Sequence, residues 1–131
     1  MRHGPDRADR IRAVRLALAL LLAALPAAAQ EGRRAFEDHC ASCHAVDRGA
    51  PPGPGPNLAG VIGRVVGGAE GFDYSPVLEA ARAAGDRWDA ARLGRFLEDP
   101  EEMYPGLWMG GNGARDAADR AAIVAFLQST R

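Results

Sequence analysis

The segment Cys40-Ala41-Ser42-Cys43-His44 holds the residues of this chain whose types and spacing are best suited to chemistry. The C-x-x-C-H spacing is typical of covalent haem attachment. Two thiols three residues apart lie on neighbouring faces of one helical turn, so each can add to one of the two vinyl groups of a haem. The imidazole that follows is then placed to bind the iron as the proximal ligand. The motif therefore predicts one covalently bound haem c.

Other kinds of site share the same motif, namely a redox-active dithiol, half of a zinc site and a structural disulfide. A thioredoxin-like dithiol favours a βαβ context, which the sequence does not show. A zinc site needs two more cysteine or histidine ligands, and only His3 and His39 remain in the chain. Haem attachment is therefore the favoured interpretation, with a CxxC dithiol-disulfide oxidoreductase as an alternative.

The N-terminal segment has the composition of a secretory signal peptide. A basic stretch, a short apolar run and a group of small residues follow one another: Arg10, Arg12 and Arg15, then residues 16–25, then Pro26 as a break, and then 27–29. This order predicts a signal peptide over residues 1–29, cleaved after Ala29, and one domain over 30–131. Because the apolar run is shorter than the roughly 20 residues that span a bilayer, an uncleaved membrane anchor is the less favoured alternative. Export predicts a periplasmic protein, which suits reactive cysteines.

The charge balance of residues 30–131 is acidic. They contain 11 arginines and 15 aspartates and glutamates, a formal net charge of −4, and the chain has no lysine. A nucleic-acid partner would need a basic stripe and is therefore excluded. The sequence shows no acid–base pair or phosphate-binding loop, so we expect no small-molecule substrate and no enzyme activity. We expect a monomer.

Hydrophobic spacing and helix-boundary residues predict an all-α fold, with four or five short helices wrapped with long loops around one covalently bound haem. Residues 49–56 are too rich in glycine and proline for helix or strand. Loops of this length are expected where they cover a cofactor. The helices expected are 32–44, a short turn within 57–63, a helix from Ser75-Pro76 to Gly85, one from Asp89 that Pro100 stops, and one from Asp116 to the C-terminus.

Several motifs in a fixed order are similar to those of one known family. They are Gly32-x-x-x-Phe36, Cys40-x-x-Cys43-His44, Gly55-Pro56-Asn57-Leu58-x-Gly60-x-x-Gly63-Arg64, Gly71-Phe72-x-Tyr74, Trp88, Pro105-Gly106-x-x-Met109 and Ile123–Leu127. From about Gly32 to the C-terminus, the chain resembles the class I cytochromes c, of the mitochondrial type and its soluble bacterial relatives. The resemblance implies a single-haem, one-electron carrier between redox partners in a respiratory or photosynthetic chain. The alternative with the same cofactor is a peroxidase or ligand sensor with an open iron site.

The resemblance also implies the second ligand of the iron. Met103 and Met109 are the methionines of residues 30–131, and a thioether has the softness that this position needs. Met109 matches the family's Pro-Gly-x-x-Met position, and Met103 matches none. His44 and Met109 are therefore the expected axial ligands, and the carbonyl of Pro56 is expected to accept a hydrogen bond from the His44 imidazole.

Further positions match residues around the haem of the family. Tyr74 and Trp88 match groups that hydrogen-bond a haem propionate, and Arg64 matches an arginine near the propionates. Phe96 stands where the family usually has a tyrosine near the methionine ligand. Gly32, Phe36 and Phe126 match the crossing of the first and last helices.

The docking face departs most from the family pattern. Mitochondrial-type relatives surround the exposed haem edge with lysines, whereas the matching segments here carry Glu101, Glu102, Trp108 and Asp116, with Arg34 and Arg115 as cations. We expect membrane or soluble redox proteins to dock at the haem edge near Trp108, and a strongly acidic partner is disfavoured.

Overall fold

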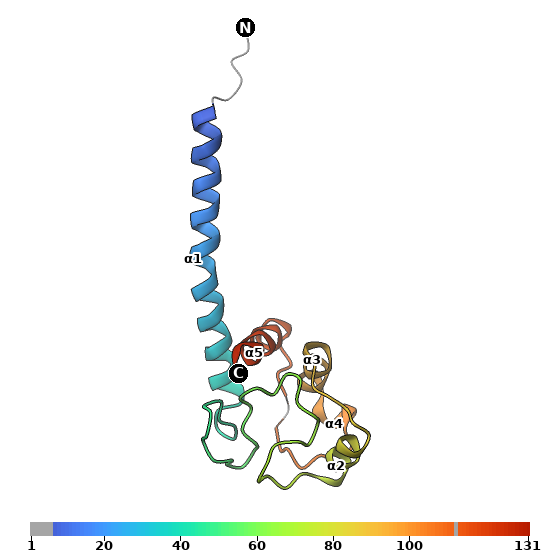
Figure 1. Ribbon diagram of the computed structural model, residues 1–131. Helices are drawn as coiled ribbons and strands as arrows, with labels where there is room; N and C mark the ends of the chain where they lie inside the picture. Colours follow the sequence, from blue (N-terminus) through green and yellow to red (C-terminus); the bar gives the residue numbers. More distant parts are fainter. Residues whose placement is uncertain (1–6, 112) are drawn as a thin grey trace.

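The computed structural model describes residues 7–111 and 113–131, and its fold is all-α, as predicted. The helices are α1 (Arg7–His39), α2 (Pro76–Ala83), α3 (Ala90–Glu98), α4 (Pro100–Met103) and α5 (Ala117–Ser129), joined by long loops (Figure 1). Within the described ranges no β-strand forms, and Val65 and Arg87 make an isolated antiparallel bridge.

Helix α1 is much longer than expected. It begins at Arg7 and ends at His39, so the predicted bounds of 32–44 are wrong at both ends. Alanine and leucine dominate its first half and are strong helix formers, which favours a helix before residue 32, and this helix includes Pro26. In Figure 1 this half extends away from the body formed by the rest of the chain. In the part of the chain that the structure describes, no helix is both long enough and apolar enough to cross a membrane.

The C-terminal half of α1 packs against α5, as Figure 1 shows. The rings of Phe36 and Phe126 lie 5.3 Å apart between their centroids. Gly32 is buried at the crossing, and a Cβ atom there would lie 2.7 Å from the carbonyl oxygen of Ala122 and 2.9 Å from the Cβ of Phe126. The close approach of the two helices therefore depends on the missing side chain of Gly32, at the crossing expected from the sequence.

Two of the predicted helix starts have the expected cap. The Asp89 side chain accepts a hydrogen bond from the amide of Arg92 at 2.7 Å, and α3 follows. The Asp116 side chain accepts from the amides of Ala118 and Asp119 at 2.9 and 3.0 Å, and α5 follows. An aspartate at this position satisfies amide groups that have no partner within the helix.

Helix α4 is absent from the sequence prediction. Asp99 accepts from the amide of Glu102 at 3.0 Å, and Pro100 occupies the first turn of α4. Pro100 therefore follows the end of α3, as predicted, and also begins a new helix, a position where proline fits well. The helical turn expected within 57–63 is instead a pair of turns, because Gly60 and Gly63 have φ values of +65° and +90°.

The hydrophobic core is formed by side chains from α1, α3 and α5 together with residues of the loops and α2. Its fully buried members include Val66, Ile123 and Leu127. Trp88 and Phe96 pack edge to face with ring centroids 5.0 Å apart. These aromatic rings also form part of the wall of an internal cavity, so core and site share side chains.

Candidate functional site

A cavity of about 770 Å³ lies between the end of α1, the loops, α3 and the segment after α4. Its volume falls within the range of about 300–1,000 Å³ that is common for small-molecule and cofactor sites. Cys40, Cys43, His44 and Met109 all line it, although Met109 is far from the others in the sequence. The fold therefore brings the two thiols, the imidazole and the thioether to the same cavity.

The two cysteines lie on a tight turn that continues the direction of α1. The amide of Cys40 donates to the carbonyl of Phe36 at 2.8 Å, and the amide of His44 donates to the carbonyl of Cys40 at 2.9 Å. This spacing is that of a helical turn, although α1 itself ends at His39. Both thiols are free, and burial raises the pKa of Cys40 to about 11. Cys43 is exposed.

His44 is held by one hydrogen bond from its ring. Its Nδ1 atom lies 2.8 Å from the carbonyl oxygen of Pro56, the contact expected from the sequence. Because a carbonyl oxygen can only accept, Nδ1 must carry the proton, and Nε2 keeps its lone pair. Burial lowers the pKa of His44, while the hydrogen bond to Pro56 acts in the opposite direction. The imidazole is therefore favoured in the neutral form that a metal ion requires.

Gly55 sets the distance between the loop and the His44 ring. A Cβ atom at Gly55 would lie 2.6 Å from Nδ1 and 2.9 Å from Nε2 of His44, and closer still to Cε1. The amide of Gly55 donates to the carbonyl of Cys43 at 2.9 Å, so the loop is fixed to the cysteine turn. Only a residue without a side chain leaves the imidazole where it is.

Of the two candidate methionines, Met109 lines the cavity and Met103 does not. Met103 instead borders a separate surface hollow beside Arg95 and Glu102. The segment after Met109 returns to α3, where the amide of Ala114 donates to the carbonyl of Leu97 at 2.7 Å. The fold therefore places Met109, and not Met103, in the wall of the cavity that Cys40, Cys43 and His44 also line.

Arg64 is a half-buried cation at the cavity wall. Its guanidinium donates to the carbonyls of Asn57 at 2.9 Å and Ala59 at 3.3 Å. Burial lowers its pKa, an effect partly offset by Tyr74. Within the described residues no carboxylate forms an ion pair with it. A half-buried cation without a counter-charge suits an anionic group in the cavity.

Tyr74, Trp88 and Phe96 line the same cavity. The Tyr74 hydroxyl accepts from the amide of Ala69 at 3.1 Å, which leaves its own proton available for a second hydrogen bond. Trp88 and Phe96 are buried and contribute an apolar wall. Gly32, Phe36 and Phe126 are absent from the lining and belong to the helix crossing.

Ser75 is a site residue that sequence reasoning missed. It precedes α2 at the predicted N-cap position, yet its side chain makes no capping hydrogen bond. The residue is 3% exposed and lines the cavity, and its Oγ has no hydrogen-bond partner among the described residues. A buried hydroxyl without a partner is costly, so this atom points to a polar group in the cavity. Its position directly after Tyr74, a residue already expected near the haem propionates, could have identified it from the sequence.

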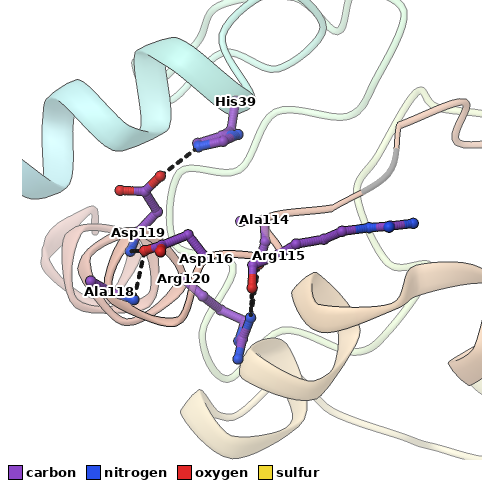
Figure 2. Close-up of polar contacts among 7 residues, drawn as sticks. All are labelled: His39, Ala114, Arg115, Asp116, Ala118, Asp119 and Arg120. Atoms are coloured by element: carbon purple, nitrogen blue, oxygen red, sulfur yellow. Dashed lines mark hydrogen bonds and ion pairs between the residues drawn. The ribbon is translucent and has the colours of Figure 1, made fainter.

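One end of the cavity wall is exposed at Trp108, whose side chain is 67% accessible. Where the end of α1 meets α5, a group of polar and charged residues lies around the first turn of α5 (Figure 2). The Nε2 atom of His39 lies 2.9 Å from a carboxylate oxygen of Asp119. Arg120 donates to the carbonyls of Ala114 and Arg115 at 2.9 and 3.1 Å.

Comparison with known proteins identifies the family to which these features belong. A sequence profile described as Cytochrome c matches residues 29–131. This chain belongs to the cytochrome c family. The match covers all the cavity-lining residues described above, from the cysteine turn to the Met109 segment.

Three relatives illustrate the breadth of the similarity. Cytochrome c of Stellaria longipes is 36% identical over 102 residues, which cover 78% of this chain and 92% of the relative. Cytochrome c2 of Rhodomicrobium vannielii is 38% identical over 97 residues, 74% of each chain. Cytochrome c2 iso-1 of Magnetospirillum molischianum is 40% identical over 96 residues, 72% of this chain and 92% of the relative.

Membership of the cytochrome c family gives the cofactor and the general role. The family binds one covalent haem c with its iron, and its members are electron carriers that work with redox proteins and are not enzymes. The cavity fits this group. It offers two free thiols, an imidazole with a free Nε2, a thioether, a half-buried guanidinium and an unpartnered hydroxyl on a largely apolar wall.

Proposed function

We propose that this protein is a one-electron carrier between redox partners in a respiratory or photosynthetic chain. Cys40 and Cys43 would hold the haem through thioether bonds, and His44 and Met109 would be its two axial ligands. The observation that supports this most strongly is the single cavity lined by all four side chains. Bound haem c supplies an iron that changes between the ferrous and ferric states.

The residues around His44 would keep that ligand in one orientation. Pro56 accepts from Nδ1 and fixes the tautomer, so that Nε2 is the atom that faces a metal ion. Gly55 lets the loop pass directly beside the ring. An imidazole held on two sides changes little when the oxidation state changes, which favours electron transfer without loss of a ligand.

Polar groups in the cavity lining would hold the haem propionates. Arg64, Tyr74, Trp88 and Ser75 all line the cavity. Arg64 supplies a positive charge, and the Tyr74 and Ser75 hydroxyls supply donors that none of the described residues accepts from. Charge-assisted hydrogen bonds of this kind are stronger than neutral ones.

Two apolar residues of the cavity lining would lie near Met109: Phe96, by the family resemblance, and Leu107, two residues earlier in the chain. Phe96 is buried, and Leu107 is half-buried at the cavity wall. Phe96 replaces a tyrosine that the family resemblance would have placed near the methionine ligand. A dry environment disfavours the more highly charged ferric state, so these residues would raise the reduction potential.

Export to the periplasm is part of the proposal. Residues 1–29 would act as a signal peptide, and 30–131 would be the mature cytochrome domain. Edman sequencing of the exported protein tests this, with Gln30 expected as the first residue. An intact N-terminus on the exported protein would instead support an anchor.

Docking of redox partners near Trp108, by a monomer, completes the proposal. Trp108 joins the cavity wall to the surface, and the neighbouring Gly110 and Gly111 are exposed. Backbone without side chains lets a partner approach the cavity closely. A large exposed aromatic ring is also a common anchor at protein interfaces.

The proposed ligand set is tested by carbon monoxide binding and redox titration of the haem-loaded protein. The wild-type protein should give one reversible one-electron step and bind carbon monoxide slowly, because Met109 occupies the sixth position. The Met109→Ala variant should have a lower potential and bind carbon monoxide rapidly. Equally rapid binding by wild type and variant would favour the open-site peroxidase or sensor alternative.

A further inference from the structure

Helix α4, which precedes the exposed Trp108 in the chain, carries two carboxylates without an ion pair among the described residues. Glu101 and Glu102 are both exposed, and neither forms an ion pair within the described residues. The amide of Gly106 donates to Oε1 of Glu101 at 2.9 Å. This bond holds the Glu101 carboxylate beside the turn that leads directly to Trp108, so its charge has a fixed place on this surface.

The hollow next to these residues adds to the negative charge. Three carboxylates and one guanidinium line this hollow, which is formed by Arg95, Glu98, Asp99, Glu102 and Met103. Arg120 lies 3.8 Å from Glu98, and its side chain is largely buried. With Glu98 paired to Arg120, α4 and this hollow keep Asp99, Glu101 and Glu102 against Arg95, which is an excess of negative charge.

Around the first turn of α5, the acidic side chains have local polar partners, as Figure 2 shows. Asp119 pairs with His39 at 2.9 Å, and Asp116 accepts two amides of the first turn of α5. The Arg115 side chain extends away from this group in Figure 2 and is exposed. Among the described residues, Asp116 and Asp119 therefore have hydrogen-bond partners near the start of α5, whereas Glu101 and Glu102 on α4 have no ion pair.

We infer that the redox partner presents basic side chains beside an apolar recess that receives Trp108. Glu101 and Glu102 would face the basic side chains, and the Trp108 ring would enter the recess. Opposite charges on two approaching surfaces raise the association rate and orient the encounter, whereas like charges across an interface are costly. This inference rests on the proposed function, because it requires electrons to leave near Trp108. It goes further by naming the charge of the partner and the residues that select it.

The test uses a lysine-rich mitochondrial cytochrome c as a basic redox protein. Stopped-flow mixing of the reduced holoprotein with this oxidised probe gives a second-order rate constant, measured over a range of ionic strength. We expect the rate constant to fall about tenfold or more from low to high salt, because added ions screen attraction between exposed charges. A rate constant that stays flat or rises with salt would overturn the inference.

A matched pair of double variants locates the charge. Glu101→Gln with Glu102→Gln should lower the low-salt rate constant about threefold to tenfold and flatten its salt dependence. Glutamine at 101 keeps an oxygen that can accept from Gly106. The control is Glu37→Gln with Glu79→Gln, which removes the same charge from exposed residues outside the cavity lining and the acidic hollow. If the control lowered the rate constant equally, net charge and not this surface would be responsible, and the inference would be wrong.

The apolar part of the inference has its own variant. Trp108→Ala should lower the rate constant at both low and high salt, since an apolar contact is not screened by ions. An unchanged rate constant at high salt would exclude the recess for Trp108. Redox titration of every variant distinguishes failure of the proposed function from failure of the partner inference. A protein that cannot be reduced reversibly contradicts the proposed function. A reversibly reduced protein with the wrong salt dependence contradicts only the partner inference.

Discussion

Replacing Gly32 by alanine should destabilise the protein, although alanine is the better helix former. Gly32 lies in α1 at its crossing with α5. The added Cβ would lie 2.7 Å from the carbonyl oxygen of Ala122 and 2.9 Å from the Cβ of Phe126. Both distances are shorter than real Cβ contacts, and the first atom belongs to backbone that cannot rotate away. The two helices would therefore have to separate.

The size of the effect follows from two opposing contributions. Alanine gains about 1 kcal/mol over glycine inside a helix. Overpacking of a close contact costs about 1–3 kcal/mol. Because the clash involves backbone, we expect the upper part of this range and a net loss of about 1–2 kcal/mol in the free energy of unfolding. In a domain of this size each kcal/mol corresponds to a fall of about 4–8 °C in Tm.

Gly94 provides the matched control. It lies inside α3, and a Cβ there would meet no atom within 4 Å. Gly94→Ala should therefore stabilise the protein by about 0.5–1 kcal/mol. Guanidinium unfolding of the haem-loaded protein, followed by far-ultraviolet circular dichroism, measures both changes. If Gly32→Ala were as stable as Gly94→Ala, the close crossing of α1 and α5 would be refuted.

Three further substitutions test the haem site. Replacing both Cys40 and Cys43 by alanine should abolish covalent haem attachment and leave the chain largely unfolded, because so small a domain has little core of its own. Full helicity and a sharp thermal transition in this double variant would argue against this prediction. Gly55→Ala should displace the His44 ring and lower the reduction potential measured by redox titration, and an unchanged potential would disprove the close contact. Ser75→Ala should destabilise the haem-loaded protein by about 1–3 kcal/mol in guanidinium unfolding if the hydroxyl donates to a propionate, whereas a gain in stability would show an unsatisfied hydroxyl.

Features fixed by local chemistry could be predicted from the sequence. The caps at Asp89 and Asp116 depend on a side chain and amides two or three residues away, and both are present. The bond between His44 and Pro56 followed from a resemblance with several ordered motifs, and the structure has it at 2.8 Å. In each case the determining residues are adjacent or belong to one motif.

Features that depend on competition between segments were predicted less well. The start of α1 was predicted too late because an alanine- and leucine-rich segment extends the helix toward the N-terminus. Helix α4 is only four residues long and has too few turns for any periodicity to be visible. Pro100 was treated as a stop signal, although proline also suits the first turn of a new helix.

Ser75 shows a different limit of sequence reasoning. Its position before Pro76 correctly marked the start of α2. The direction of its hydroxyl depends on the tertiary packing around the cavity. The preference of serine for the N-cap position would instead give a hydrogen bond to an amide of α2, and this bond is absent. Met109 and Met103 have the same side-chain chemistry, so from the sequence only the family resemblance distinguished them as candidate ligands. In the structure they line different cavities.

The visible absorption spectrum of the ferric, haem-loaded protein tests the proposed site most directly. A charge-transfer band between methionine sulfur and ferric iron should be present in the wild-type protein and in Met103→Ala, and absent in Met109→Ala. Loss of the band in Met103→Ala with its retention in Met109→Ala, or its absence from the wild-type protein, would contradict the assignment of His44 and Met109 as the axial ligands.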